Sequence, residues 1–327
     1  MSRLIPTAIN LNRMAPYDVI IIGGGPAGTA AAVYSARKKL KTLLITDSFG
    51  GQSVVSDDIQ NWIGEAHITG FELAQKFEEH VRSFSEVEIK TGRVVSVRSV
   101  QKCFEARTDK GAVYEGKAVI LAAGASRRKL GIPGEEQFNG KGVVYCSTCD
   151  APLFGGKKVA VVGGGNAGLE AVVDLFPYAA KIYLLIRGDT LKGDAVTQEE
   201  VRKNPKVEII FNAEAKEITG DKFVTGLKYF DKKTEKEKNL AVEGVFVEIG
   251  SVPNSEIVKD LVELDQWGQV KIDSKHASTS YPGVFAAGDI TDDPYKQNNI
   301  SAGDAVKAAL AAYNYILKRD KLSPAAG

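Results

Sequence analysis

Cysteine is scarce in this chain of 327 residues, which has three cysteines, Cys103, Cys146 and Cys149. Such a low and odd number argues against the disulfide-stapled scaffold of a small secreted protein. In a reducing compartment, a close pair of cysteines is more often catalytic or metal-binding than structural. Cys146 and Cys149, which are separated by two residues, are therefore the first candidates for chemistry.

Net charge and long apolar runs are also lacking. The 42 basic and 41 acidic side chains leave a formal net charge of +1, which gives no electrostatic reason to expect nucleic acid or an anionic membrane as a partner. No apolar run approaches the ~18 residues of a membrane span. The N-terminus has no secretory apolar core, because Pro6, Asn10 and Asn12 interrupt it. We therefore expect a cytoplasmic protein with a short, loosely held N-terminal extension and neither membrane nor nucleic acid as partner.

Glycine, in contrast, is arranged in an internal repeat. An apolar stretch at residues 17–22 leads into GGGPAG at residues 23–28 and then into an alanine-rich helical pattern. A second apolar stretch, at residues 158–162, leads into GGGNAG at residues 163–168 and another helical pattern. Each copy has the order strand, glycine turn, helix, which opens a dinucleotide-binding βαβ unit.

The glycines of each motif have separate tasks. The first permits a tight turn, the second lets the backbone approach a pyrophosphate, and the third lets the helix pack closely on the strand. The helix N-terminus then offers N–H groups and a positive dipole end to the phosphates. One motif alone is weak support, whereas two in matching contexts indicate two dinucleotides, a flavin and a nicotinamide. The expected contacts are Gly23, Gly25, Pro26, Ala27 and Gly28 in the first motif and Gly163, Gly165, Asn166, Ala167 and Gly168 in the second.

Two more apolar stretches read as buried strands that end at glycine. Residues 118–123 lead through Ala123 to Gly124, and residues 283–287 lead to Gly288 and Asp289. We expect these four strand-end residues to contact a cofactor.

Turn-rich segments after residue 125 and at residues 250–254 give two crossing points between domains. We therefore predict an α/β protein with two dinucleotide-binding domains, each Rossmann-like and three-layered, in which the nicotinamide domain is inserted into the FAD domain. The FAD-binding domain is discontinuous and comprises residues 1–125 and 252–327. The NAD(P)H-binding domain comprises residues 126–251 and carries the Cys-x-x-Cys pair.

The cysteine pair itself predicts redox chemistry. A two-residue spacer lets Cys146 and Cys149 sit on one helical turn, close enough to form a small disulfide ring. Such pairs commonly contain one thiol of lowered pKa, which makes thiol–disulfide exchange fast near neutral pH. Asp150 follows directly and can carry a proton to or from a sulfur or a flavin nitrogen.

Zinc is the main alternative for a cysteine pair. A structural zinc site needs four ligands, usually from two such pairs, and the sequence has no second pair. The three histidines stand far apart along the chain. We therefore expect no metal. Cys103, in an alternating stretch, is interpreted as a small packing residue.

The order of these motifs resembles a known family. Two GGGxAG motifs, a Cys-x-x-Cys-Asp segment before the second, and Phe285-Ala-Ala-Gly-Asp289 occur in this order in the low-molecular-weight bacterial thioredoxin reductases, and the likeness covers residues 16–318. The chain is similar also to the flavoprotein core of alkyl hydroperoxide reductase. The resemblance implies a homodimer in which electrons pass from NAD(P)H through FAD and the Cys146–Cys149 disulfide to thioredoxin or a thioredoxin-like protein with its own Cys-x-x-Cys.

The resemblance also implies individual roles. Cys149 matches the flavin-proximal sulfur, Cys146 its partner, and Asp150 the acid. Asp289 resembles the aspartate at the ribityl chain of the flavin. Asp47 holds the adenosine ribose in one interpretation and is a solvated turn residue in the other. The remaining residues expected at the flavin are Gly51, Gln52, Asn61, Lys296 and Gln297.

The coenzyme is less well defined. No acid ends the strand at residues 181–186, where an NADH-specific motif usually has one. Arg187 and Lys192 follow instead and are expected to face a 2′-phosphate, although Gly188 replaces an arginine that many family members have there. We favour NADPH over NADH.

The acceptor also leaves alternatives open. Tyr145, Pro152 and residues 294–297 resemble the hydroperoxide reductase core more than a thioredoxin reductase, but the chain has no room for the N-terminal pair of thioredoxin-like domains of that enzyme. A dithiol oxidase of the same fold would pass electrons from a small dithiol to oxygen. A flavin-binding module whose redox state governs a partner, without turnover, is the third interpretation.

Overall fold

The structure is a computed structural model that describes residues 17–56 and 58–322, so the expected N-terminal extension lies outside the described residues. The chain forms two compact units. The first comprises residues up to 54, residues 72–125 and residues from 253 onward, and the second comprises residues 55–71 and 126–252. The short segment 55–71, assigned from sequence to the first domain, groups with the second unit.

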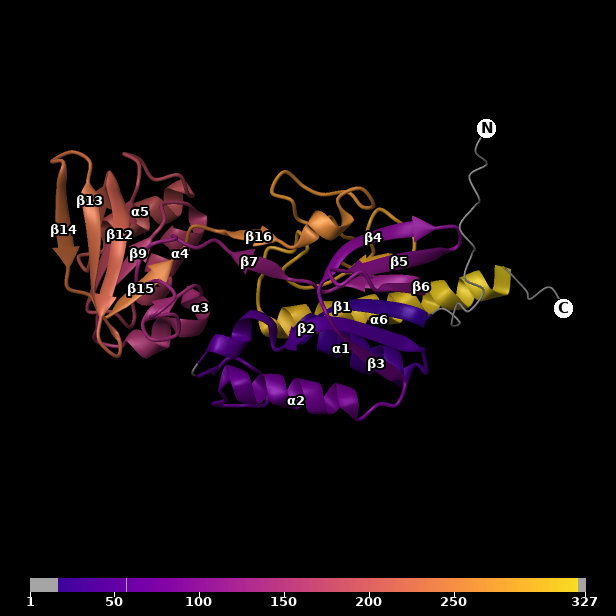
Figure 1. Cartoon of the computed structure of the whole chain (residues 1–327). Coiled ribbons are helices and arrows are strands. Elements are labelled where there is room, and N and C mark those ends of the chain that lie inside the picture. Colours follow the sequence, from indigo (N-terminus) through magenta and orange to yellow (C-terminus); the bar gives the residue numbers. More distant parts are fainter. Residues whose placement is uncertain (1–16, 57, 323–327) are drawn as a thin grey trace, which may run out of the picture. The chain divides into compact units, whose positions relative to one another are not determined.

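The first unit is built on a seven-stranded sheet with the order β3-β2-β1-β6-β5-β4, in which β17 also pairs with β6 (Figure 1). Strands β1, β2, β3, β6 and β17 pair in parallel, whereas β4 and β5 form antiparallel pairs. The strands are β1 (Tyr17–Gly24), β2 (Thr42–Phe49), β3 (Val87–Thr91), β4 (Val94–Val100), β5 (Cys103–Thr108), β6 (Val113–Leu121) and β17 (Val284–Ala286).

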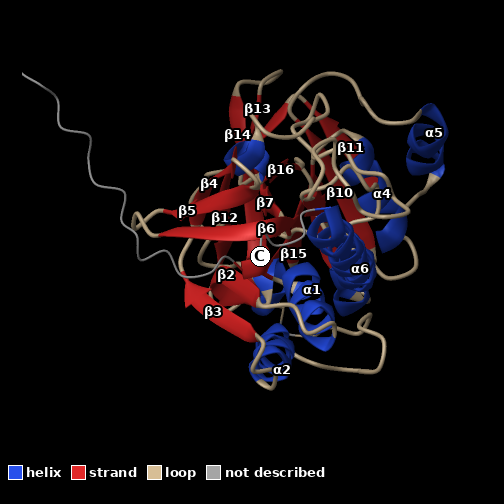
Figure 2. Ribbon diagram, turned by 90° about the vertical axis from the view of Figure 1, so that its right-hand side faces the viewer, coloured by secondary structure: helices blue, strands red, loops and turns tan. Residues whose placement is uncertain are grey.

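This sheet is buried on both faces. Alternate residues of β1 point to opposite sides, so Val19 and Ile21 join one apolar core and Ile20 and Ile22 join another. Helices α1 (Pro26–Arg37) and α6 (Asn298–Leu322) lie side by side on the first core (Figure 2). The unit is therefore layered, as an unbroken apolar strand such as β1 requires. The sequence also forms α2 (Gly70–Arg82) and the 3₁₀ helices η1 (Gly51–Val55) and η3 (Ser255–Val258).

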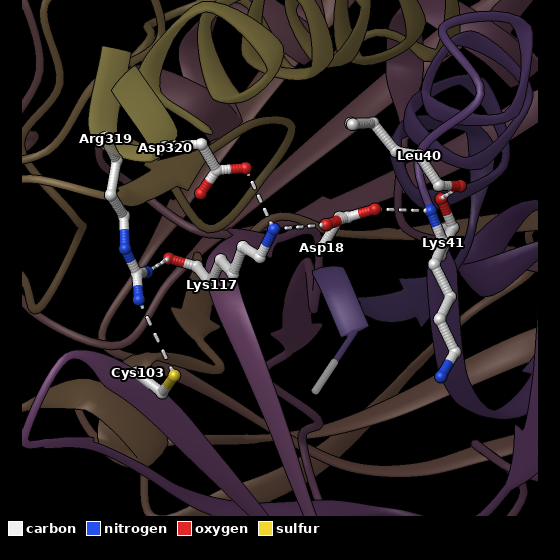
Figure 3. Close-up of polar contacts among 8 residues, drawn as sticks. Asp18, Leu40, Lys41, Cys103, Lys117, Arg319 and Asp320 are labelled. Carbon is white, nitrogen blue, oxygen red and sulfur yellow. Dashed lines mark hydrogen bonds and ion pairs between the residues drawn. The ribbon is translucent and has the colours of Figure 1, made fainter. Parts of the chain in front are cut away.

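Polar contacts attach the end of α6 to the sheet (Figure 3). The Nζ of Lys117, on β6, lies 3.0 Å from Oδ1 of Asp18 and 3.0 Å from Oδ2 of Asp320. Arg319 donates from Nη1 to the carbonyl oxygen of Lys117 at 2.9 Å, and its Nη2 lies 3.7 Å from the Sγ of Cys103. Cys103 is thus a half-buried strand residue of β5 next to a guanidinium group.

The second unit repeats the arrangement on a smaller scale. Its five strands have the order β11-β10-β9-β15-β8 and all pair in parallel. They are β8 (Val143–Val144), β9 (Lys158–Val162), β10 (Lys181–Ile186), β11 (Val207–Phe211) and β15 (Gly244–Val247). A separate antiparallel sheet contains β12 (Ala213–Gly220), β13 (Val224–Asp231) and β14 (Lys236–Leu240).

Both faces of the parallel sheet are again covered. Val159 and Val161 of β9 pack in a core with α4 (Asn166–Leu175), α5 (Ala195–Lys203) and the 3₁₀ helix η2 (Ala151–Phe154). Ala160 and Val162 pack in a second core with the antiparallel sheet. The predicted α/β class with two Rossmann-like folds is confirmed.

The two crossings between the units differ from the predicted turns. They contain short strands, β7 (Ala125–Arg127) and β16 (Ser251–Pro253), which pair as a two-stranded sheet. The N–H of Arg128 donates to Gly250 and the N–H of Asn254 donates to Gly124, each at 3.0 Å. Pairing satisfies backbone groups that an isolated linker would leave to water, and the glycines at 124 and 250 take positive φ beside the strands.

Candidate redox site and nucleotide-binding motifs

Cys146 and Cys149 form a disulfide in the second unit, with their Cα atoms 5.4 Å apart. The pair lies at the start of the short helix α3 (Ser147–Asp150), which follows strand β8. The predicted disulfide is confirmed. Because a two-residue spacer folded as one helical turn brings both sulfurs to one side, local structure alone is enough to place them together.

Hydrogen bonds fix this turn to the helix of the second glycine motif. The hydroxyl groups of Ser147 and Thr148 donate to Oδ2 of Asp174 on α4, at 2.8 and 3.2 Å. The amide nitrogen Nδ2 of Asn61 lies 3.9 Å from the Sγ of Cys149. Asn61, expected from sequence at the flavin, therefore contacts the sulfur that was assigned to the flavin side.

Two acids lie near the disulfide: Glu248 is buried and Asp150 is half-buried. Burial raises the pKa of Asp150 to about 7, although the positive charge of Arg127 lowers it. Burial likewise raises the pKa of Glu248 to about 8, and Arg127 again opposes the shift. A carboxyl group with a pKa near neutrality can hold and release a proton under physiological conditions.

Glu248 was not predicted from sequence. It follows directly after the apolar strand β15, and an acid at the carboxyl end of a buried strand is the signal that would have pointed to it. The same reasoning had selected Asp289 after β17. The position in the first unit that corresponds to Glu248 is Ala122, because Ala122 donates its N–H to Ile22 of β1 just as Glu248 donates its N–H to Val162 of β9, each at 2.9 Å.

The first glycine motif forms a cradle between β1 and α1. A Cβ atom on Gly28 would lie 1.7 Å from the carbonyl oxygen of Gly23, so only glycine allows this approach of helix and strand. Gly23 has a φ of +113°, which disfavours any other residue. Gly25 is the N-cap residue of α1. No N-cap side chain accepts a hydrogen bond from the first N–H groups of the helix. These groups fit the phosphates of a dinucleotide.

The second motif has the same construction. A Cβ atom on Gly168 would lie 2.1 Å from the carbonyl oxygen of Gly163, whereas one on Gly165 would meet no atom within 4 Å. Gly165 caps α4, again without a side-chain cap. Open space in front of the helix N-terminus is what an approaching pyrophosphate needs. Asn166 turns its Oδ1 toward the loop that follows β10, where it accepts from the N–H of Asp194 at 2.7 Å.

The other residues predicted to bind the flavin are spread over the first unit. A Cβ atom on Gly288 would lie 3.2 Å from the side chain of Ala27, so the end of β17 lies against the first motif. Gly51 lies beside Gly25, and the side-chain amide of Gln52 donates to the carbonyl oxygen of Ala125. The carbonyl oxygen of Ala123 accepts from Asn254 at 2.7 Å.

Two charged positions complete that group. Lys296 donates from Nζ to the carbonyl oxygen of Thr291 at 2.6 Å, and its burial lowers its pKa although Asp289 opposes the shift. The neighbouring Gln297 begins the turn into α6, since its carbonyl oxygen accepts from Ser301 at 2.9 Å. Asp47 is exposed and lies within β2, which continues to Phe49.

The expected coenzyme-selecting cations are both exposed. Arg187 directly follows the last residue of β10, and its side chain forms no hydrogen bond or ion pair with the residues that the structure describes. Lys192 donates its backbone N–H to Gly164, in the second motif, at 2.8 Å. Lys192 is thereby positioned beside the motif through its backbone.

Comparison with known proteins gives the family. The sequence profile of the pyridine nucleotide-disulphide oxidoreductases matches residues 17–311. The chain belongs to this family. The resemblance to thioredoxin reductases and to the hydroperoxide reductase flavoprotein is confirmed, as is the predicted class of enzyme, a pyridine nucleotide-dependent oxidoreductase.

Solved structures with the same fold include two thioredoxin reductases. That from Streptococcus pyogenes is 37% identical with a TM-score of 0.88, covering 93% of this chain and 99% of the other. That from Giardia duodenalis is 30% identical with a TM-score of 0.87, covering 93% and 100%. The chain therefore shares its fold with these thioredoxin reductases, and its family supports a flavin and a pyridine nucleotide as cofactors.

The sequence relatives are longer proteins. An NADH dehydrogenase of Ferdinandcohnia aciditolerans is 43% identical over 313 residues, which are 96% of this chain and 60% of the relative. An alkyl hydroperoxide reductase chain of Pseudomonas aeruginosa is 43% identical over 307 residues, 92% of this chain and 58% of the relative. The chain thus spans about three fifths of the length of these relatives.

Within residues 17–56 and 58–322, no cluster of three or more His, Cys, Asp or Glu side chains could hold a metal ion. Within the same ranges, no helix is long and apolar enough to cross a membrane.

Proposed function

We propose that the protein is a flavin-dependent disulfide reductase that passes electrons from NAD(P)H through FAD and the Cys146–Cys149 disulfide to thioredoxin or a thioredoxin-like protein. The observation that carries the proposal is the disulfide in a Cys-x-x-Cys turn, with the half-buried acid Asp150 next to it in sequence. Such a disulfide exchanges with an external one that it can reach.

FAD is assigned to the first motif and the pyridine nucleotide to the second. Gly23, Gly25 and Gly28 would hold the pyrophosphate of FAD at the start of α1, with Asp289 beside the motif. Gly163, Gly165 and Gly168 would do the same for the pyridine nucleotide at α4. The remaining residues assigned to FAD are Pro26, Ala27, Asp47, Gly51, Gln52, Asn61, Ala123, Gly124, Gly288, Lys296 and Gln297, and those assigned to the pyridine nucleotide are Asn166, Ala167, Arg187 and Lys192.

The residues around the disulfide supply protons and orientation. When bound, FAD supplies the exchange of electrons between the pyridine nucleotide and the disulfide. Asp150 would hold the proton that a sulfur takes up when the disulfide is reduced, because burial keeps its pKa at about 7. Asp174 holds the turn through Ser147 and Thr148, so that both sulfurs keep their positions. One of the two sulfurs, as a thiolate, would then attack the disulfide of the partner protein.

NADPH is the preferred coenzyme in this proposal. No acid ends β10, where one would bind a ribose hydroxyl, and Arg187 stands exposed directly after the strand. The name of the relative from Ferdinandcohnia aciditolerans is NADH dehydrogenase, so the choice of coenzyme has to be measured.

The acceptor is a protein with its own Cys-x-x-Cys, and the enzyme acts as a homodimer. Two of the solved structures that share the fold are thioredoxin reductases, which supports thioredoxin as the acceptor. The cytoplasm, where reduced pyridine nucleotide is made, is the compartment in which we expect the reaction.

The test is anaerobic reduction followed by transfer. Stopped-flow absorbance should show the flavin bleached by NADPH, and added oxidised thioredoxin should be reduced with one NADPH consumed per disulfide. Flavin bleaching without transfer to thioredoxin or to any other Cys-x-x-Cys protein would contradict the assignment. Reduction of the flavin by dithiothreitol together with oxygen consumption, but not by either coenzyme, would indicate a dithiol oxidase instead.

A further inference from the structure

Glu248 is a buried acid to which the proposed function gives no role. The residue is 9% exposed, and its Oε1 has no hydrogen-bond partner among the described residues. The backbone N–H of Ser147, which lies between the two cysteines, acts on the Glu248 carboxyl group and favours its ionised form, which lowers its pKa. A buried oxygen left without a partner costs free energy, so its retention beside a disulfide calls for an explanation.

The parallel pairing of β8 with β15 brings Cys146 and Glu248 to the same edge of the sheet. Val144 of β8 pairs with Phe246 of β15, and two residues further along the two strands come Cys146 and Glu248. Parallel strands end at the same edge of a sheet, so both residues emerge there together.

On its other side, β15 pairs with β9, and the N–H of Glu248 donates to Val162 at 2.9 Å. A Cβ atom on the next residue, Gly163, would lie 2.1 Å from the carbonyl oxygen of Glu248. Glu248 therefore stands between the cysteine turn and the second glycine motif, and all three belong to one compact unit.

The charged groups that act on Glu248 come from three elements. Arg127 on β7 favours its ionised form, whereas Asp150 on α3 and Asp174 on α4 disfavour it. Burial is the larger effect and raises the pKa of Glu248 to about 8, while that of Asp150 is about 7. With the disulfide formed, both acids therefore keep their protons to a higher pH than an ordinary carboxyl group.

We propose that Glu248 is a positioning residue that couples proton uptake to reduction of the Cys146–Cys149 disulfide, an inference that rests on the proposed function. Two electrons from the reduced flavin, or from a dithiol, break the S–S bond, and one proton converts one sulfur to a thiol. The other sulfur is left as a thiolate in the Cys146–Cys149 turn, whose Ser147 backbone acts on Glu248. Its negative charge favours the protonated form of Glu248, which takes a second proton from solvent whenever it was ionised before reduction.

This coupling acts only where Glu248 is ionised in the disulfide form. Below about pH 7 the carboxyl group is protonated in both redox states and contributes nothing to the equilibrium. Above about pH 8 the disulfide form carries the carboxylate, so reduction has to overcome its repulsion of the thiolate or bind an extra proton. A neutral residue at position 248 should therefore make the pair easier to reduce at high pH alone.

A redox titration tests the coupling. The full-length protein with its flavin is equilibrated with mixtures of reduced and oxidised dithiothreitol between about pH 6 and about pH 9. Alkylation and mass spectrometry of the peptide that contains Cys146 and Cys149 give the reduced fraction independently of turnover and of Cys103. Wild type is compared with Glu248→Gln and with Glu243→Gln, an exposed acid immediately before the opposite end of β15.

At about pH 6, the three proteins should have the same equilibrium constant within about twofold. At about pH 9, Glu248→Gln should be reduced about tenfold more easily than the other two, which corresponds to a pKa coupling of about one unit and to about 30 mV. A difference of equal size at every pH would show that Glu248 serves packing alone and would overturn the coupling. No difference at any pH would overturn it as well.

Failure of the proposed function would look different. If no ratio of reduced to oxidised dithiothreitol reduces the Cys146–Cys149 disulfide of wild type, the disulfide is not redox-active. That result would contradict both the proposed function and the coupling to Glu248. If Glu248→Gln does not fold, infrared difference spectra of Asp150→Asn replace it. Reduction at about pH 9 should then convert one carboxylate to a protonated carboxyl group, and the absence of that band would overturn the coupling.

Discussion

The hydroxyl group of Ser147 donates a hydrogen bond to Oδ2 of Asp174 at 2.8 Å. This contact joins the turn that holds the disulfide to the helix that begins at the second glycine motif. The disulfide and the expected pyridine nucleotide site are therefore parts of one packed unit, and a change in one can be measured against the other.

The disulfide should be needed for the second half of the reaction only. Replacing Cys149 by serine should abolish reduction of thioredoxin, while the rate of flavin bleaching by the coenzyme changes little, because electron transfer from coenzyme to flavin does not pass through sulfur. Cys103→Ser, which alters a half-buried cysteine beside Arg319, should leave both steps intact. A Cys149→Ser protein that reduces thioredoxin at the normal rate would refute the mechanism.

Asp150 should control the rate of reduction of the disulfide. Asp150→Asn cannot give up a proton, so we expect this step to slow by about 100-fold or more. The wild-type rate should fall as the pH rises through about 7, where the acid loses its proton, and the variant should lose this inflection. Single-turnover absorbance measurements across this pH range give both values. An unchanged inflection in the variant would assign it to another group.

Asp150 should also make stability depend on pH. Its pKa is about 7 in the folded protein and 3.8 ordinarily, so the folded state binds more protons than the unfolded state between these values. The free energy of unfolding therefore falls as the pH rises from about 4 to about 7. As the pH rises over this interval, the free energy of unfolding of Asp150→Asn, measured by urea denaturation, should increase relative to that of wild type. Asp221→Asn, which changes an exposed acid, is the control. Its free energy of unfolding should depend on pH in the same way as that of wild type.

Arg187 should distinguish the two coenzymes. A charge-assisted hydrogen bond contributes about 1.5–3 kcal/mol to binding. Arg187→Ala should therefore lower the affinity for NADPH by at least about tenfold and leave the affinity for NADH nearly unchanged. Lys203→Ala, an exposed cation paired with Glu199 on α5, is the matched control. Binding can be followed by titration of the oxidised protein with NADP⁺ and NAD⁺. Equal losses for both, or a wild type that prefers NADH, would show that Arg187 does not recognise the 2′-phosphate.

Two glycines of the second motif should separate folding from binding. A side chain on Gly168 would lie 2.1 Å from backbone, so Gly168→Ala should lower the stability of the second unit. Gly165→Ala meets no atom within 4 Å and has an allowed φ of −91°, so it should fold normally. The affinity for the coenzyme should nevertheless fall by about tenfold or more, because the new methyl group fills the space through which the phosphates approach the helix N-terminus. Normal coenzyme affinity in a folded Gly165→Ala protein would argue against this site.

Local sequence was sufficient for the elements whose cause is local. Glycine spacing after an apolar strand predicted both β1–α1 and β9–α4, because only glycine allows the turn and the contact of helix with strand. The disulfide followed from a two-residue spacer. These features depend on residues within a few positions of one another, which a single sequence displays.

Tertiary structure decided what depends on distant residues. Glu248 lies 102 positions after Cys146, and only the parallel register of β8 with β15 brings the two together. Asn61 meets Cys149 through a segment that groups with the second unit although it lies outside the insertion predicted from sequence. The pKa of Asp150 likewise depends on burial by remote parts of the chain. Apolar patterning specifies which strands form, but their pairing order and the solvent excluded around each acid are set when the sheets assemble.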